Sequence, residues 1–233
     1  MNFTNTFFSD VVHLLYPHVC AGCGSDVISR GQVICFECTS GMPVTGFCFH
    51  EQNPVEKIFR GRLFLANASA QVYFTKDSPV QNMLHRLKYG GLKEIGILMG
   101  HLTGEDLKRS GLYKDVDAVV PLPLNVRKQK RRGYNQAALI AEGIGSALNI
   151  PVLNDVVARK KYTETQTHKS RAERWNNIEG KFEVVNAGEL MDKHVLLVDD
   201  VITTGATLES CGMELLKTAG LRLSIAAFAY TAL

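Results

Sequence analysis

The sequence predicts an α/β protein with a parallel sheet covered by helices on both faces, preceded by a small cysteine-rich module. From residue 116 onward, short apolar runs alternate with helix-like runs, and strands that alternate with helices form parallel sheets. Near the N-terminus, five of the six cysteines fall between residues 20 and 48. We therefore expect a helix plus Cys-rich module in residues 1–55 and the α/β domain in residues 56–233.

Bulk composition is that of an ordinary soluble globular protein, with 45% hydrophobic and 21% charged residues. The net charge of +3 does not by itself indicate a nucleic-acid partner. No segment has the apolar length of a membrane span, so no membrane insertion is expected. Residues 1–19 carry Asp10 and His13 and lack a basic start, which argues for a short helix ending at Pro17 rather than a signal peptide. We expect a cytoplasmic protein whose cysteines are thiols or metal ligands.

The first half of the α/β domain contains one clear helix signal. Residues 78–89 begin with Ser78 as N-cap and Pro79 in the first turn, and stop at Gly90. The alternation in residues 62–74 suggests strands in a hairpin. Residues 92–111 predict a second helix that internal glycines weaken.

The second half of the domain repeats strand and helix signals. Strands are expected at 116–124, 151–160, 180–185, 194–200 and 222–232, with helices at 133–150 and 206–220.

Two C-x2-C pairs supply four thiolates, the number that a tetrahedral structural zinc site requires. The pairs are Cys20 with Cys23 and Cys35 with Cys38. One alternative, a redox C-x-x-C, normally occurs once at the start of a helix that follows a strand. The other is unbound buried cysteines, which normally occur singly. Two pairs in one short module favour structural zinc.

Two cysteines remain outside these pairs. Cys48 lies near His50 and Glu51 and is a substitute ligand, the remnant of a third pair, or a bystander, which we favour. Cys211 falls in a helix-like run with several leucines and reads as a small core residue.

The stretch "KHVLLVDDVITTGATLES", residues 193–210, is the strongest functional signal. Asp199 and Asp200 follow an apolar strand, where ligands of parallel sheets bind. The segment TTGAT, residues 203–207, opens a helix, whose N–H groups and dipole favour an anion, and its threonines add hydroxyl donors. Carboxylates would repel a phosphate but suit hydroxyl groups, Mg²⁺ or a developing positive charge. A ribose 5-phosphate satisfies both halves, whereas a plain helix cap requires only one acid.

These residues resemble the phosphoribosyl-pyrophosphate (PRPP) motif of type I phosphoribosyltransferases, an apolar strand, two acids and T-T-G-x-T. The resemblance implies that Asp199 and Asp200 contact the ribose hydroxyls and act in catalysis. It implies a second group of residues around the 5-phosphate: Thr203, Thr204, Gly205, Ala206 and Thr207.

Two further stretches and the cysteine pairs narrow the resemblance to the ComF family of competence-associated proteins. They are "VVPLPLNVRKQKRRGYNQAALIAEGI" and "TETQTHKSRAERWNNIEGKFEV". The family likeness implies a type I phosphoribosyltransferase-like fold for residues 56–233, zinc in the N-terminal module and Mg²⁺ bound with PRPP. It implies that Pro121, Leu122 and Pro123, in the pyrophosphate-binding loop, and Arg132 bind PRPP. It also implies single-stranded DNA and proteins of the competence machinery as partners.

Two basic stretches have open interpretations. Residues 127–132 carry five positive charges in six positions, which suits polyphosphate or a nucleic-acid backbone, or a solvated loop. Residues 159–177 contain Tyr162, His168 and Trp175 and read as a loop that closes over the site, a surface for stacking bases, or an ordinary loop.

Three functional hypotheses follow. The first is an enzyme that transfers a phosphoribosyl group from PRPP to a nitrogen acceptor that the sequence does not identify. The second is a non-enzymatic binding protein for single-stranded DNA or a partner, in which the PRPP-site scaffold is kept. The third is a regulator that senses PRPP and signals through the zinc module. Fold alone does not decide among them.

Overall fold

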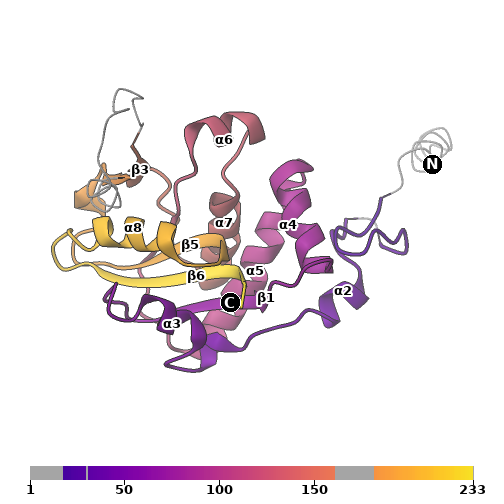
Figure 1. Ribbon diagram of the computed structural model, residues 1–233, viewed down its shortest axis with the longest axis horizontal. Coiled ribbons are helices and arrows are strands. Elements are labelled where there is room, and N and C mark those ends of the chain that lie inside the picture. Colours follow the sequence, from indigo (N-terminus) through magenta and orange to yellow (C-terminus); the bar gives the residue numbers. More distant parts are fainter. Residues whose placement is uncertain (1–17, 30, 161–180, 233) are drawn as a thin grey trace, which may run out of the picture.

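Four parallel strands form the central sheet, in the order β1-β6-β5-β2 (Figure 1). The structure is a computed structural model that describes residues 18–29, 31–160 and 181–232. The strands are β1 (Ala68–Tyr73), β6 (Arg222–Tyr230), β5 (His194–Ile202) and β2 (Ala118–Pro121). In β5 and β6 nearly every residue is buried, as expected for strands covered on both faces.

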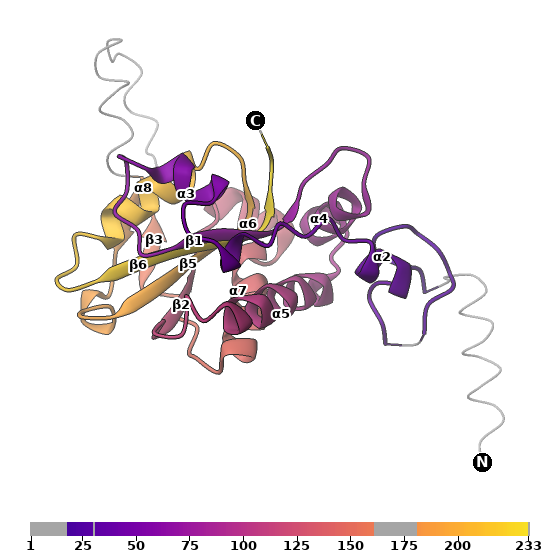
Figure 2. The ribbon, with the colours of Figure 1, turned by 90° about the horizontal axis from the view of Figure 1, so that it is seen from below.

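Helices cover both faces of this sheet, which confirms the predicted fold class (Figure 2). On one face lie α5 (Lys93–Ser110) and α7 (Gln136–Leu148). On the other lie α3 (Pro54–Phe59) and α8 (Ala206–Leu215). Each face has its own apolar cluster of buried side chains, so the sheet separates two cores.

The internal glycines of α5 let it pack closely against α7. A Cβ at Gly100 would overlap the carbonyl oxygen of Ile140, and one at Gly143 would overlap that of Ile97. The sequence interpretation of these glycines as a weakness was therefore incomplete. Their intrinsic helix cost is real, but the missing side chains allow the two backbones to touch.

The hairpin expected in residues 62–74 is wrong. Only β1 forms there, and it runs parallel to β6 with Ala68 opposite Ile225. The chain before it is already attached to β6, because the Ala66 N–H donates to the Leu223 carbonyl at 2.8 Å. A ready partner at the sheet edge replaces the local hairpin partner.

The strands expected at 151–160 and 180–185 do form, but outside the parallel sheet. β3 (Val157–Arg159) and β4 (Phe182–Val184) pair antiparallel in a sheet of their own. Before β3, a single parallel bridge joins Val152 to Val119 of β2.

Other element bounds differ from expectation near the site. α4 (Pro79–Tyr89) begins as predicted, and Ser78 Oγ accepts a hydrogen bond from the Gln81 N–H at 3.2 Å. α8 ends at Leu215, earlier than expected. The basic run forms a short helix, α6 (Val126–Arg132), because Asn125 caps it through the Arg127 N–H at 3.0 Å.

The N-terminal module contains α2 (Phe36–Ser40) and lies beside α4 (Figure 1). Its buried cysteines share an apolar cluster with Val80, Met83 and Leu84 of α4. Short 3-10 turns occur at Phe47–Phe49 and Ala187–Glu189. The division at residue 55 stays a prediction. The helix expected before Pro17, and Tyr162, His168 and Trp175, lie outside the described residues.

One expectation concerns membranes. Among residues 18–29, 31–160 and 181–232, no helix combines the length and the apolar character that a bilayer crossing needs.

Candidate functional site

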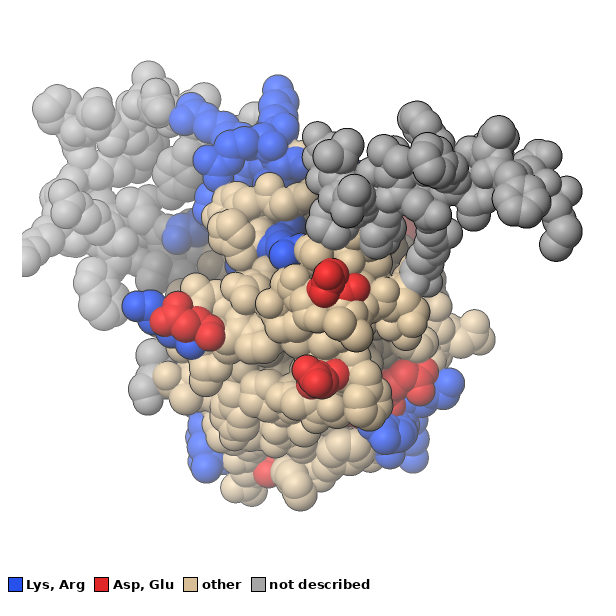
Figure 3. All heavy atoms as spheres, turned by 90° about the vertical axis from the view of Figure 1, so that its right-hand side faces the viewer, with Lys and Arg blue, Asp and Glu red and all other residues tan. Residues whose placement is uncertain are grey.

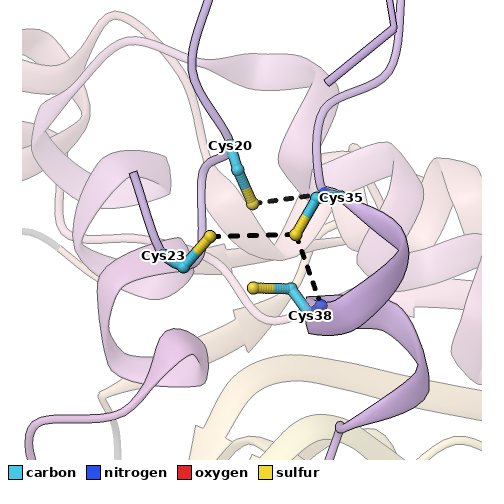
Figure 4. Close-up of side chains that lie close together, drawn as sticks. All are labelled: Cys20, Cys23, Cys35 and Cys38. Atoms are coloured by element: carbon cyan, nitrogen blue, oxygen red, sulfur yellow. Dashed lines mark hydrogen bonds between the residues drawn. The ribbon is translucent and has the colours of Figure 1, made fainter. Parts of the chain in front are cut away.

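The four paired cysteines converge on one point. The sulfur atoms of Cys20, Cys23, Cys35 and Cys38 all lie within 4.8 Å of one another, and Figure 4 shows the side chains turned inward from two segments. Cys23 Sγ lies 3.7 Å from Cys35 Sγ, close to the ~3.8 Å expected between sulfurs around a tetrahedral zinc ion. The cluster can hold a structural zinc.

Backbone N–H groups support these sulfurs. The Cys35 N–H lies 3.2 Å from Cys20 Sγ, and the Cys38 N–H lies 3.4 Å from Cys35 Sγ. Burial acts against ionisation of Cys20, but the N–H groups of Cys23 and Cys35 prevail and lower the pKa of its thiol to about 6. Donors of this kind stabilise thiolates, the form that binds metal.

Cys48 stands apart from this cluster. The group of four cysteines, in the part of the chain that the structure describes, does not include it. Burial, and then the Asp106 carboxylate, raise the pKa of Cys48 to about 11, which disfavours the thiolate. The interpretation of Cys48 as a bystander fits this placement better than a ligand role.

The acidic pair lies within β5 rather than after its end. The strand continues to Ile202 because β6 continues to pair with it, with Asp199 opposite Ala227 and Val201 opposite Ala229. The expectation that the strand ends at the acidic pair is therefore wrong. Neighbouring strand residues face opposite sides of a sheet, so the two carboxylates do not point the same way.

Contacts of the two carboxylates agree with this alternation. Asp200, only 5% exposed, lies with its Oδ2 2.5 Å from Nζ of Lys88 in α4. Asp199 is half-buried on the side of α8, where its charge adds to burial in raising the pKa of Cys211. Burial, and then the neighbouring Asp200 carboxylate, raise the pKa of Asp199 well above its usual range.

The threonine-rich loop leads from β5 into α8. Gly205 has φ 73°, and a Cβ there would lie 2.8 Å from Cε1 of Phe59, so both conformation and space require glycine. No side chain caps the first turn of α8, which leaves its N–H groups available. Thr203, Thr204, Ala206 and Thr207 are all exposed around this turn.

The loop that begins at Pro121 lies beside the acidic pair. Pro121 is opposite Val198 in the sheet, and the Leu122 N–H donates to the Val198 carbonyl at 2.8 Å. The Asn135 side chain donates to the Leu122 carbonyl at 3.0 Å and fixes the loop from the other side. Leu122 is buried and Pro123 half-buried. Because β2 and β5 are parallel neighbours, their carboxyl ends form one edge, where ligands of such sheets bind.

Family comparison now identifies the domain. Residues 131–232 match the family described as Phosphoribosyl transferase domain. This chain contains a phosphoribosyl transferase domain. The match includes the acidic pair and the loop at 203–207, and begins after the Pro121 loop and the cysteine module.

Three relatives extend the likeness beyond the domain. Competence protein F of Haemophilus influenzae is 42% identical over 118 residues, 50% of this chain and 52% of that protein. Competence protein ComFC of Streptococcus pneumoniae is 29% identical over 152 residues, 65% of this chain and 63% of that protein. DNA utilization protein YhgH of Salmonella typhimurium is 26% identical over 208 residues, 85% and 84% of the two chains. These likenesses support the predicted resemblance to ComF-type, phosphoribosyltransferase-like proteins.

The alignment with Competence protein F covers about half of its length. The activity and partners of the whole Competence protein F can therefore be considered for this chain only as a proposal.

Sequence reasoning missed the contribution of α4 to the transferase domain. Lys88 falls near the end of the helix predicted over residues 78–89 and was given no role there, yet it forms an ion pair with Asp200. The Tyr134 hydroxyl donates to the Leu87 carbonyl and attaches α4 to the segment between α6 and α7. A lysine one residue before "YGG" carries no local signal, because its partner lies 112 positions later in the sequence.

Arg132, the last residue of α6, lies against the end of α4 rather than in a solvated loop. One guanidinium nitrogen donates to Gln136 Oε1 at 2.6 Å, and the guanidinium carbon lies 5.4 Å from the centre of the Tyr89 ring. Arg132 thereby lines a cavity of about 390 Å³ that borders the acidic pair through Lys88.

The positive charges of α6 gather at one end of the molecule. Five of its seven residues are Lys or Arg, and all but Arg132 are exposed. Figure 3 shows Lys and Arg side chains concentrated at the top of that face, where Figure 1 places α6, with acidic side chains lower down.

A second polar cluster lies at the opposite, amino end of the sheet. His194 Nε2 lies 2.9 Å from Ser224 Oγ, and His194 Nδ1 lies 3.3 Å from Asp115 Oδ1. The order Ser, His, Asp resembles a hydrolytic triad, but Ser224 is 0% exposed inside the sheet. A nucleophile without access to substrate does not act, so this cluster is structural.

Proposed function

We propose that the protein binds PRPP with Mg²⁺ and transfers its phosphoribosyl group to a nitrogen acceptor, in the cytoplasm. The single observation that carries this proposal is the turn at Gly205. It presents uncapped N–H groups and exposed threonine hydroxyls at the same sheet edge as two carboxylates. A helix N-terminus attracts phosphate, and carboxylates accept hydrogen bonds from hydroxyl groups.

Each part of PRPP has a matching group in this arrangement. The 5-phosphate would lie on residues 203–207, and the ribose hydroxyls on Asp200, with Asp199 on the other side of the strand. The pyrophosphate would lie along residues 121–124, next to β5. Mg²⁺, with carboxylate and phosphate oxygens as ligands, would neutralise the pyrophosphate charge.

Transfer requires one bond to form and one to break. The lone pair of the acceptor nitrogen forms the bond to ribose C1, and the C1–O bond breaks with its electron pair on the departing pyrophosphate. The nitrogen then gives a proton to water. Positive charge develops on the ribose while the C1–O bond is breaking and the C1–N bond is still incomplete. A carboxylate held beside the ribose lowers this barrier. Asp200, held in an ion pair by Lys88, is the side chain suited to that role.

The decisive experiment is a calorimetric titration of the zinc-loaded protein with PRPP and Mg²⁺. We expect saturable binding by the wild type and loss of binding in Asp199→Asn/Asp200→Asn. Glu142→Gln, an exposed acid in the middle of α7, is the matched control and should bind like the wild type. A folded, zinc-loaded wild type that does not bind PRPP would refute the proposal.

A second candidate function is favoured by α6. Its exposed cations suit the phosphate backbone of single-stranded DNA. The names of the relatives, competence protein and DNA utilization protein, connect such binding with DNA uptake. In this function the protein would work with other proteins of competence, and PRPP binding would be retained or lost independently.

Salt dependence tests this second function. We expect the affinity for a labelled oligothymidylate to fall with rising salt, and Lys128→Gln/Lys130→Gln to reduce the slope by about 1.4, or 0.7 for each single-strand phosphate contact. These two lysines are exposed on α6 and do not line the cavity beside Lys88. An unchanged slope in the variant would remove α6 from the DNA interface.

A further inference from the structure

A cavity of about 390 Å³ lies between the end of α4 and the end of α6, and Lys88 connects it to the acidic pair. It shares Arg132 with the residues assigned to PRPP, but none of residues 121–123, 199–200 or 203–207 lines it. Three cations and two phenol rings line it, and none of its lining residues is acidic. The lining residues are Lys88, Tyr89, Gly91, Arg131, Arg132 and Tyr134. Its composition indicates a ligand with negative charge and a flat ring.

Two features of the lining suit a charged or aromatic ligand. The buried Nε of Arg132 has no hydrogen-bond partner in the described part of the chain. A buried donor without a partner costs free energy, so this nitrogen calls for a partner such as a water, an ion or a ligand. The rings are already used as cation platforms, with Arg132 5.4 Å from the Tyr89 ring centre and Lys93 Nζ 5.5 Å from that of Tyr134.

We propose that this cavity is the acceptor site and takes a planar, anionic acceptor, such as an aromatic amine that carries a carboxylate. This inference rests on the proposed function, because it names the class of molecule that receives the phosphoribosyl group. The connection is Lys88, which lines the cavity and contacts Asp200 at 2.5 Å. Only the side chain of Lys88 therefore connects a ligand in the cavity with Asp200, where the ribose is proposed to bind.

Lys88 also makes the two sites dependent on each other. While Asp200 is free of ligand, it neutralises Lys88 and reduces the positive charge of the cavity. When ribose hydroxyls take the Asp200 carboxylate, Lys88 loses part of that interaction and becomes available to the anionic acceptor. PRPP should therefore increase the affinity for the acceptor, and the effect should be reciprocal.

The probe for this site is 2-aminobenzoate, which is planar, anionic and fluorescent. Aniline, which lacks the carboxylate, is the neutral comparison. We expect 2-aminobenzoate to bind the wild type more tightly when PRPP and Mg²⁺ are present. Lys88→Met should weaken its binding ten- to a hundredfold, roughly the value of a charge-assisted hydrogen bond. Lys88→Arg should restore most of it, and aniline should respond to neither change.

Asp200→Asn separates this inference from the proposed function. Without PRPP, the variant should bind 2-aminobenzoate about tenfold more tightly than the wild type, because Lys88 has lost its partner. This holds even if PRPP does not bind at all. The double variant Lys88→Met/Asp200→Asn should bind 2-aminobenzoate as weakly as Lys88→Met, with only the preference over aniline that Arg131 and Arg132 provide. Lys114→Met, an exposed lysine before β2 at the amino end of the sheet, is the matched control.

Three results would overturn the inference. The first is equal binding of aniline and 2-aminobenzoate by the wild type. The second is an affinity for 2-aminobenzoate that is unchanged from the wild type in each of the two single variants, Asp200→Asn and Lys88→Met. The third is displacement of 2-aminobenzoate by an oligothymidylate whose own affinity depends on Lys88, which would assign the cavity to nucleic acid.

Discussion

The cysteine module and the carboxyl edge of the sheet are both candidate sites, but they are built in different ways. Four ligands of the module come from two short segments, Cys20 to Cys23 and Cys35 to Cys38. The sheet edge combines α4, β2 and β5, which are up to 112 residues apart between Lys88 and Asp200. A site encoded by local spacing can be found in the sequence, whereas a site assembled by topology is found only in part. The predictions below use this contrast.

The largest effect is expected in the module. Cys23→Ser removes one of the four convergent thiols, and we expect the purified protein to lose most of its zinc and more than about 3 kcal/mol of unfolding free energy. Elemental analysis and denaturant unfolding measure these two quantities. Cys48→Ser, a buried cysteine outside the cluster, should keep its zinc. Equal zinc contents in the two variants would show that the cluster is not the metal site.

Local and long-range information explain how far the sequence could go. The C-x2-C pairs, the Ser78 cap and the alternation of strands and helices are short-range signals, and all of them predicted what the structure contains. The stretch from Asp199 to Thr207 was placed at the correct edge for the same reason. The end of β5 was misjudged, since its length depends on pairing with β6. Lys88 and the stacking of Arg132 on Tyr89 depend on tertiary contacts, which leave no pattern in the sequence.

The candidate site at the sheet edge depends on the position of the backbone at Gly205, whereas the cysteine module depends on the side chains of its four cysteines. In Gly205→Ala the added Cβ meets Phe59 in a left-handed conformation, so we expect a loss of about 2–3 kcal/mol in unfolding free energy. Gly111→Ala shares the positive φ but has open space around its Cβ, and should cost about 1 kcal/mol. Urea denaturation of both variants isolates the contribution of the contact with Phe59. If the two losses are equal, the close approach of α3 to this turn has no energetic weight.

A smaller effect, of opposite sign, is expected at Asp199. Its pKa is raised in the folded state, so the folded protein holds a proton that the unfolded chain releases, and stability falls as pH rises towards the folded pKa. Asp199→Asn removes this penalty. We expect the variant to be about 1 kcal/mol more stable than the wild type near pH 8 and equal to it near pH 4.

Glu142→Gln provides the baseline for this measurement, because it replaces an exposed carboxyl by an amide in the middle of α7, away from the acidic pair. Destabilisation by Asp199→Asn near pH 8 would mean that the charged carboxylate is favoured in the folded protein. The sheet edge would then carry no cost for a charged Asp199 and would not differ in this respect from the cysteine module, where an N–H group lies against the Cys20 sulfur.

The smallest effect is expected at the amino end of the sheet, where β5 begins. Burial lowers the pKa of His194, against the attraction of Asp115 and together with repulsion from Arg222. The unfolded chain therefore takes up a proton at higher pH than the folded one, and stability falls as pH drops below the ordinary histidine value of about 6.5. The other acids near His194 are Asp117, which accepts from the His194 N–H at 2.8 Å, and Asp115, which faces the ring and whose own pKa is lowered.

Urea denaturation between about pH 7.5 and pH 5 should show a decline of less than about 1 kcal/mol in the wild type that His194→Gln lacks. Asp115 has a lowered pKa, so its own contribution is lost only at lower pH, below its ordinary value, and does not mask the histidine. An identical decline in both proteins would assign the proton uptake elsewhere. A decline confined to the wild type would assign the proton uptake to His194, whose Nε2 lies 2.9 Å from Ser224 Oγ inside the sheet.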